Sequence, residues 1–217
     1  MRKRLLTMLA VLALFPLAMP AGAHTQNFTY DGPKPTCVYI DVNSSAGYST
    51  SQWNPLNKAQ TSVDAINAAI NVINARPSTY SFQYCGLSNT TDYYHKVVLK
   101  YDWTIPDLGA LAVADQLRSG PNLEIGSGAL IRFNDSVTWD TCPCQSWWRI
   151  GPHYTKGSSA YSWIDFQYAL THELLHVLGA PHVTNAGHTM LASGKTFRSS
   201  IQGRTLEQHD VDYIDTK

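Results

Sequence analysis

One eleven-residue segment constrains this chain more than any other: residues 172–182 read His-Glu-Leu-Leu-His-Val-Leu-Gly-Ala-Pro-His. His172 and His176 are four positions apart, so on a helix their side chains project from the same face, one turn apart. Gly179 would end that helix, because glycine adopts the left-handed cap conformation without a steric penalty. The chain would then turn and bring His182 back to the same point. Three imidazoles predict a zinc site with a fourth position open to water, the coordination of a catalytic zinc.

Glu173 follows the first of these histidines, so its carboxylate can lie beside the zinc-bound water instead of on the metal. There it would take the water's proton as a general base and later pass that proton to the leaving amine. Buried core histidines could mimic the pattern, but three in register with a glycine break are typical of a metal site. A site that only holds metal has no need of the carboxylate.

Met190 lies eight positions after His182. With it, the segment resembles the zinc motif of the metzincin metallopeptidases, H-E-x-x-H-x-x-G-x-x-H followed by a methionine. The spacing is similar to that of the matrixins, the matrix-metalloproteinase-like branch, whose Met-turn methionine forms an apolar floor beneath the zinc. The alternative for Met190 is ordinary core filling, which is also a packing role.

The resemblance extends, more weakly, over most of residues 36 to 215. Residues 109–114 (Gly-Ala-Leu-Ala-Val-Ala) look like the matrixin edge strand, which holds substrate as an additional antiparallel strand. The resemblance therefore implies Leu111 and Ala112 as substrate-binding positions. After Met190, however, the chain lacks the Pro-x-Tyr wall of the matrixin S1′ pocket, so cleavage specificity cannot be carried over.

The chain also departs from the matrixins at their second, structural zinc. The edge-strand position holds Val113 and the following strand offers Arg132, and neither side chain can donate a lone pair to a cation. We therefore expect one catalytic Zn²⁺ per chain. Asn134 and Asp135 offer hard oxygen ligands, so a Ca²⁺ site at that turn stays open.

The first residues are typical of a signal peptide. A basic start precedes an apolar run over residues 5–19 and an A-x-A cleavage site at residues 21–23. The alternative is a membrane anchor, but the run is short and broken by Pro16, against the ~20 apolar residues of a span. We expect residues 1–23 to be removed and residues 24–217 to form one secreted catalytic domain.

Four cysteines exported into an oxidising space predict disulfides, with three possible connectivities. Buried free thiols are the alternative, and a metal site is disfavoured because Cys142 and Cys144 have no second pair at ligand spacing. We predict a Cys37–Cys85 bridge, since the first two strands should be neighbours, and a Cys142–Cys144 pair.

Strand patterns occur at residues 37–42, 81–85, 96–101, 109–114 and 129–133. Helical spacing begins at Val63, with Thr61 or Ser62 as N-cap and Pro77 as the stop. Two further helices are predicted at residues 165–178 and 205–214, the latter with a capping box formed by Thr205 and Gln208.

Strand, helix and strand in succession indicate a βαβ unit whose first strands are parallel. The expected fold is α/β (α+β), a metzincin-like zincin domain. It would have a mixed twisted sheet of about five strands, an antiparallel edge strand and three main helices.

We therefore predict a secreted zinc endopeptidase that acts on protein or peptide substrates as a monomer. Basic and acidic residues number 16 each, without a basic stripe, which disfavours nucleic acid and membrane surfaces as partners. The alternative is a secreted, non-catalytic zinc-binding adhesion or interaction module. A hydrolase of another amide, such as a cell-wall peptide crosslink, also stays open.

Overall fold

The computed structural model describes thirteen segments of the chain: residues 34–43, 56, 60–76, 80–89, 93–102, 112–119, 124–134, 139–140, 152–154, 160–162, 164–184, 189–190 and 205–215. Residues 1–23, Leu111, Cys142 and Cys144 lie outside these segments, so the predictions that concern them stay predictions. Among the described residues, no helix is long and apolar enough to cross a membrane.

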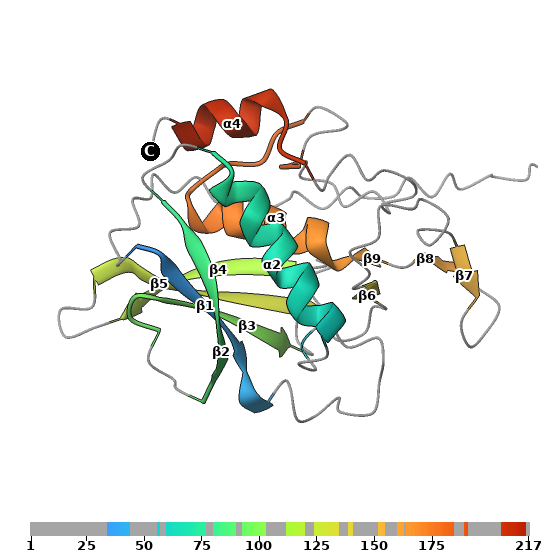
Figure 1. The fold of residues 1–217 in the computed structure, drawn as a ribbon, viewed down its shortest axis with the longest axis horizontal. Coiled ribbons are helices and arrows are strands. Elements are labelled where there is room, and N and C mark those ends of the chain that lie inside the picture. The colour runs from blue at the N-terminus through green and yellow to red at the C-terminus, as the bar shows by residue number, and fades with distance from the viewer. Residues whose placement is uncertain are drawn as a thin grey trace, which may run out of the picture.

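Five strands form the main sheet (Figure 1). They are β1 (Thr36–Asp41), β2 (Phe82–Ser88), β3 (Lys96–Asp102), β4 (Ala112–Ser119) and β5 (Glu124–Asn134). The spatial order is β2-β1-β3-β5-β4; β1 pairs in parallel with β2 and β3, and β3 with β5. Only β4 runs antiparallel to its neighbour, and it lies at one edge. The mixed sheet with an antiparallel edge strand is as predicted.

Three helices accompany this sheet: α2 (Gln60–Asn74), α3 (Phe166–Val177) and α4 (Gln208–Asp215). Figure 1 shows α2 and α3 on the same side of the sheet, with α4 beyond α3. Two short ribbons lie in the long connection before α3. They pair β6 (Trp139–Asp140) with β9 (Ile164–Asp165), and β7 (Pro152–Tyr154) with β8 (Ala160–Ser162).

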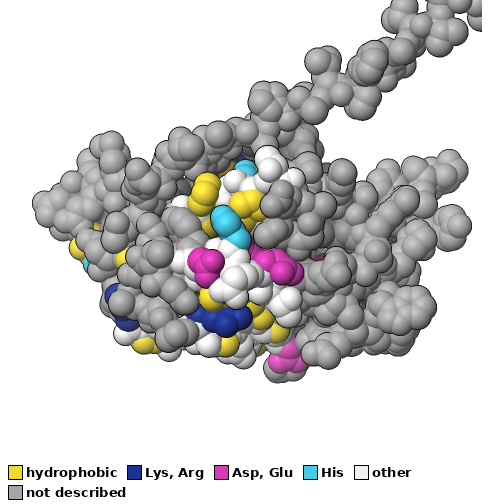
Figure 2. All heavy atoms as spheres, turned by 90° about the horizontal axis from the view of Figure 1, so that it is seen from above, with side chains coloured by type: hydrophobic (Ala, Val, Ile, Leu, Met, Phe, Trp, Pro, Cys, Tyr) yellow, Lys and Arg dark blue, Asp and Glu magenta, His cyan; other side chains and the backbone are white. Residues whose placement is uncertain are grey.

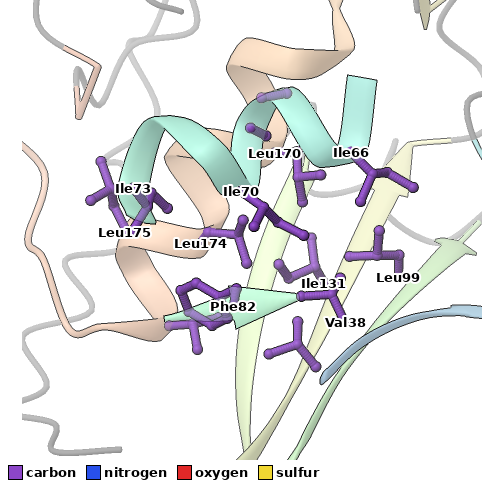
Figure 3. Close-up of a cluster of buried hydrophobic side chains, with 14 of the residues drawn as sticks. Val38, Ile66, Ile70, Ile73, Phe82, Leu99, Ile131, Leu170, Leu174 and Leu175 are labelled. Atoms are coloured by element: carbon purple, nitrogen blue, oxygen red, sulfur yellow. The ribbon is translucent and has the colours of Figure 1, made fainter. Parts of the chain in front are cut away.

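The apolar core lies between the two helices and the sheet (Figure 3). Ile66, Ile70 and Ile73 of α2 are buried at helical spacing, which confirms the periodicity seen in the sequence. Burying one such side chain stabilises the fold by about 1.5–3 kcal/mol relative to leaving it exposed. The cluster also takes in residues of four strands and of α3, among them Val38, Phe82, Leu99, Ile131, Leu170 and Leu174.

The bridge between Cys37 and Cys85 is present, with 5.4 Å between the Cα atoms. It joins β1 to β2, which are parallel neighbours as the βαβ unit required. The register shifts after Val38, so that Cys85 is the extra residue of a bulge, and the next residue, Gly86, has a φ of 94°. A residue with a side chain would be strained there, which explains the glycine.

The predicted start of α2 is wrong. The helix already includes Gln60, so neither Thr61 nor Ser62 is the N-cap, and Ser62 is buried inside the first turn. At the other end, Asn74 donates from Nδ2 to the Phe82 carbonyl (2.7 Å) and accepts from the Phe82 N–H at Oδ1 (2.9 Å). A side-chain amide thus pairs with the backbone of β2 where that edge strand has no further neighbour.

The capping box predicted for the last helix is also wrong. α4 begins at Gln208, and Asp210 accepts the hydrogen bond from the Glu207 N–H at Oδ2 (3.1 Å). Gln208 instead donates to Asp212 (2.7 Å), and the Thr205 carbonyl accepts from the Thr189 hydroxyl (3.1 Å). The helix therefore starts three residues later than predicted, and the Thr205 carbonyl bonds to a residue distant in sequence.

The hairpin of β4 and β5 is longer than the apolar patterns indicated. Its register runs from Ala112 opposite Phe133 to Ser119 opposite Glu124, with one irregularity at Leu117. Both strands extend into polar residues, because the two backbones form hydrogen bonds with each other independently of the side chains.

Candidate metal centre

Helix α3 has well-defined ends, and they determine where its histidines lie. Asp165 is the N-cap, and its Oδ1 accepts from the Tyr168 N–H (3.1 Å). At the C-terminus, Gly179 has a φ of 87° and donates to the His176 carbonyl (2.8 Å), while the next N–H, of Ala180, donates to the Leu175 carbonyl (2.9 Å). These two bonds form a Schellman motif, which reverses the chain after the helix.

The reversal brings the three predicted histidines together. The Nε2 atom of His182 lies 3.2 Å from Nε2 of His172 and 2.9 Å from Nε2 of His176. All three ligand atoms lie within 4.8 Å of one another. Nitrogen ligands around a tetrahedral zinc, at Zn–N distances of about 2.0–2.1 Å, would be about 3.3 Å apart. The spacing fits a metal ion of that size.

Two backbone carbonyls decide which ring nitrogen carries the proton. Nδ1 of His172 lies 2.5 Å from the Thr189 carbonyl oxygen, and Nδ1 of His176 lies 2.8 Å from the Ala180 carbonyl oxygen. A carbonyl only accepts, so each Nδ1 is the donor and each neutral ring keeps a lone pair on Nε2. Lone pairs that converge in this way repel one another unless a cation lies between them, and such carbonyl partners are typical of metal-binding histidines. The donor set is compatible with zinc.

His172 is the most buried of the three ligands. Burial lowers its pKa to about 4, the hydrogen bond to Thr189 opposes that shift, and the nearby His182 adds to it. A neutral imidazole at ordinary pH is the form that binds a metal.

Glu173 lies next to His172 on α3 and is 5% exposed. Burial raises the pKa of its carboxyl group to about 8. A hydrogen bond with the backbone of Ala114 lowers that pKa, and the negative charge of Asp115 raises it. A dication at the histidines would lower it further. The carboxylate thus contacts the edge strand β4 from the helix that carries two of the histidines.

That hydrogen bond also defines how β4 presents its backbone. Successive N–H groups of a strand in an antiparallel ladder point alternately toward the partner strand and away from it. The Ala114 N–H serves Glu173, so it points away from β5, and the Ala112 N–H shares that direction. Val113, whose register partner is Arg132, points its N–H toward β5.

Met190 is 1% exposed and belongs to the apolar core. Its carbonyl accepts from the Val183 N–H (2.7 Å), so Met190 is tied to the residue that follows His182. The neighbouring Thr189 supplies the carbonyl that accepts from His172. Thr189 and Met190, the predicted Met-turn residue, therefore contact His172 and the residue that follows His182, respectively.

Arg132, one of the two residues at which a second zinc is not expected, lies between two carboxylates. Its Nη1 pairs with Asp102 on β3 (2.9 Å) and its Nε with Asp115 on β4 (2.5 Å). The guanidinium joins three neighbouring strands, because Arg132 itself is on β5, between the other two. Among the described residues, the three histidines form the only group of side chains arranged to hold a metal ion.

Four residues that contribute to this centre were not predicted from the sequence: Tyr168, Thr189, Ala180 and Asp115. Two of them act through backbone carbonyls, which leave no mark on residue identity. Tyr168, four positions before His172, was the only one with a signal, since that spacing puts both side chains on one helix face.

Figure 2 looks onto the molecule from above the view of Figure 1. On this face, histidine, acidic, basic and apolar side chains of the described residues lie close together, without a patch of one charge sign. The single large apolar side chain exposed among the described residues is Leu87 of β2.

No protein-family model matches this chain, and no curated protein matches it at a significant level.

Proposed function

We propose that this chain is a secreted zinc endopeptidase, matrixin-like in fold, that hydrolyses peptide bonds in protein or peptide substrates. The observation that carries the proposal is the convergence of the Nε2 atoms of His172, His176 and His182 beside the buried carboxyl group of Glu173. Zinc at this position would supply Lewis acidity, lowering the pKa of water in its open coordination position and polarising a carbonyl oxygen.

The three histidines would hold the ion, and the hydrogen-bonded Nδ1 atoms of His172 and His176 leave the lone pairs of these two neutral rings on Nε2. Glu173 accepts the proton of the attacking water and returns it to the leaving amine. Burial favours this role, since it raises the pKa of Glu173 above its ordinary value and so makes the carboxylate a stronger base.

The edge strand β4 offers a second element of the proposal. The Ala112 N–H points away from β5, toward the side where Ala114 meets Glu173. A substrate that paired with Ala112 as an additional strand would lie alongside the general base. Leu111, the other predicted substrate position, lies outside the described residues.

Secretion is supported by the Cys37–Cys85 disulfide, because such bonds persist in oxidising compartments. The signal-peptide pattern of residues 1–23 agrees with that location.

The test is cleavage of a random peptide library by the purified secreted protein, with cut sites read by mass spectrometry. Wild-type protein loaded with zinc should cut, and a chelator should abolish cleavage. Glu173→Gln should keep the metal yet lose at least ~100-fold in turnover, the usual share of general acid–base catalysis. Glu207→Gln, the same change at the residue just before α4, is the matched control and should cut normally.

The result also separates the alternative. A wild-type protein that binds zinc tightly but cuts no library peptide would point to a zinc-binding adhesion or interaction module. Normal turnover by metal-loaded Glu173→Gln would remove Glu173 from the mechanism.

A further inference from the structure

The carbonyl oxygen of Thr189 accepts two hydrogen bonds from one face of α3. His172 donates from Nδ1 (2.5 Å) and Tyr168 donates from its hydroxyl (2.9 Å). The two donors are four residues apart, so they lie one above the other on the helix. Both residues are buried, and Thr189 is 0% exposed.

The hydroxyl of Tyr168 is a dependable donor at this point. Burial raises its pKa, and the negative charges of Asp210, Glu173 and Asp165 raise it further. The hydroxyl therefore keeps its proton at neutral pH, and the carbonyl of Thr189 can only accept.

Without Tyr168, His172 would be the remaining donor from α3 to the Thr189 carbonyl. The carbonyl could then shift together with the ring of His172 and would not fix the orientation of that ring. Tyr168 and His172 are both buried side chains of α3, so their two donors approach the carbonyl from the same helix. A second donor on the same rigid helix fixes the carbonyl relative to the helix axis. The imidazole of His172 then has one acceptor in one place, which aims Nε2 at the point shared with His176 and His182.

Thr189 has a further tether, to the segment that precedes α4. Its hydroxyl donates to the Thr205 carbonyl (3.1 Å), and Thr205 lies three residues before the start of the helix at Gln208. Thr189 is thus held from two directions, by Tyr168 on α3 and by the lead-in to α4.

We propose that Tyr168 is a positioning residue for the metal centre: with Thr189, it holds the carbonyl that orients His172. The inference rests on the metal centre of the proposed function and deepens it. Losing an outer hydrogen-bond partner of a metal ligand typically weakens metal binding by about 10–100-fold. We expect a loss in that range for Tyr168→Phe, which removes one hydroxyl and keeps the ring.

The experiment measures zinc affinity of the full chain by competition with a chromophoric chelator. The variants are Tyr168→Phe and Thr189→Val, the second of which removes the hydroxyl tether to Thr205. Tyr84→Phe is the matched control, because Tyr84 lies on β2, at the sheet edge opposite β4. Each protein is also loaded with Co²⁺, whose visible absorption reports ligand geometry, and the unfolding of each metal-free protein is measured.

The proposal expects weaker zinc binding and an altered Co²⁺ spectrum for both site variants, with neither change in the control. Unchanged affinity and spectrum in folded Tyr168→Phe would overturn it, and Tyr168→Leu, which also lacks the hydroxyl, decides the question if Tyr168→Phe does not fold. A loss confined to metal-free stability, with unchanged affinity, would mean a merely structural role and also overturn it.

The proposed function can fail separately. A wild-type protein that binds zinc but cuts no peptide contradicts the peptidase and leaves this measurement intact. A wild-type protein that binds no zinc contradicts both.

Discussion

The buried carboxyl group of Glu173 is hydrogen-bonded to the backbone of Ala114, so helix α3 meets edge strand β4 at the residue that directly follows His172. The contact makes the position of β4 part of the geometry of the proposed general base. Asp115, the next residue of the strand, is paired with Arg132 on the neighbouring strand. The edge of the sheet and the metal centre are therefore one structural unit.

Replacing Glu173 should stabilise the metal-free protein increasingly as pH rises. The folded-state pKa of Glu173 is raised to about 8 from an ordinary 4.5, so its favourable contribution is complete below pH 4.5 and is lost as pH rises through 8. Gln does not titrate. The advantage of Glu173→Gln should therefore grow between pH 5 and 8, by at most about 1.4 kcal/mol per pH unit.

Chemical unfolding of both metal-free proteins across this pH range measures the difference. Titrating groups that do not interact with the charge of Glu173 contribute equally to both proteins and cancel. A difference in stability that does not change with pH would contradict the raised pKa.

Each of His172→Ala, His176→Ala and His182→Ala should abolish tight metal binding, because each removes one of three ligand nitrogens. Wild-type metal affinity should also fall as pH is lowered, since protons compete for the same Nε2 lone pairs. Metal content after dialysis, measured by elemental analysis, checks both expectations. His209→Ala, an exposed histidine of α4, is the control and should keep its metal.

Proline at two adjacent positions of β4 should have different effects. Ala112→Pro removes an N–H that points away from β5, so it should raise KM or abolish cleavage while leaving the fold intact. Val113→Pro removes an N–H that points toward β5, so it should lower the unfolding temperature instead. Kinetics and thermal unfolding of the two variants decide the matter. Unchanged kinetics for folded Ala112→Pro would place substrate on another surface.

One tightly bound zinc per chain is expected. Arg132 stays protonated and already pairs with Asp102 and Asp115. The guanidinium thus takes the place that a metal ion would need beside these two carboxylates. Elemental analysis after exhaustive dialysis should give a zinc-to-protein ratio near one. A reproducible ratio near two that falls to near one in a variant lacking one of the three histidines would reveal a second site.

Peptide mapping without reduction should recover Cys37 linked to Cys85, as the structure has it. The remaining pair, Cys142 with Cys144, is expected to be linked across Pro143. Breaking the first bridge with a Cys37→Ser and Cys85→Ser double variant should destabilise the protein by about 2–5 kcal/mol. A crosslink between the two pairs would contradict the assignment.

Local chemistry could be read in advance where it depends on neighbours in the chain. Asp165 as the start of α3, Gly179 as its end and the histidine spacing all act within a few residues, and the structure places them as expected. The βαβ unit also followed from order alone, because a helix between two strands leaves few ways to return to the sheet.

Other features could not be read in advance because their partners are distant in sequence. β4 gained polar residues from its pairing with β5, and the Thr205 carbonyl accepts a hydrogen bond from Thr189, sixteen residues away. The link from Tyr168 to Thr189 spans twenty-one residues and ends on a backbone atom, which no residue pattern records.

The sequence by itself determined the ligand set, His172, His176 and His182, and the carboxyl group of Glu173, because helical spacing and one glycine are local constraints. Only the tertiary structure decided what surrounds them: the carbonyls that set the ring tautomers, the burial that raises the pKa of Glu173, and the edge strand that its carboxyl group contacts. The physical reason is the distance along the chain over which each effect acts. Backbone conformation depends on adjacent residues, whereas desolvation and hydrogen-bond partners depend on whatever the folded chain brings close.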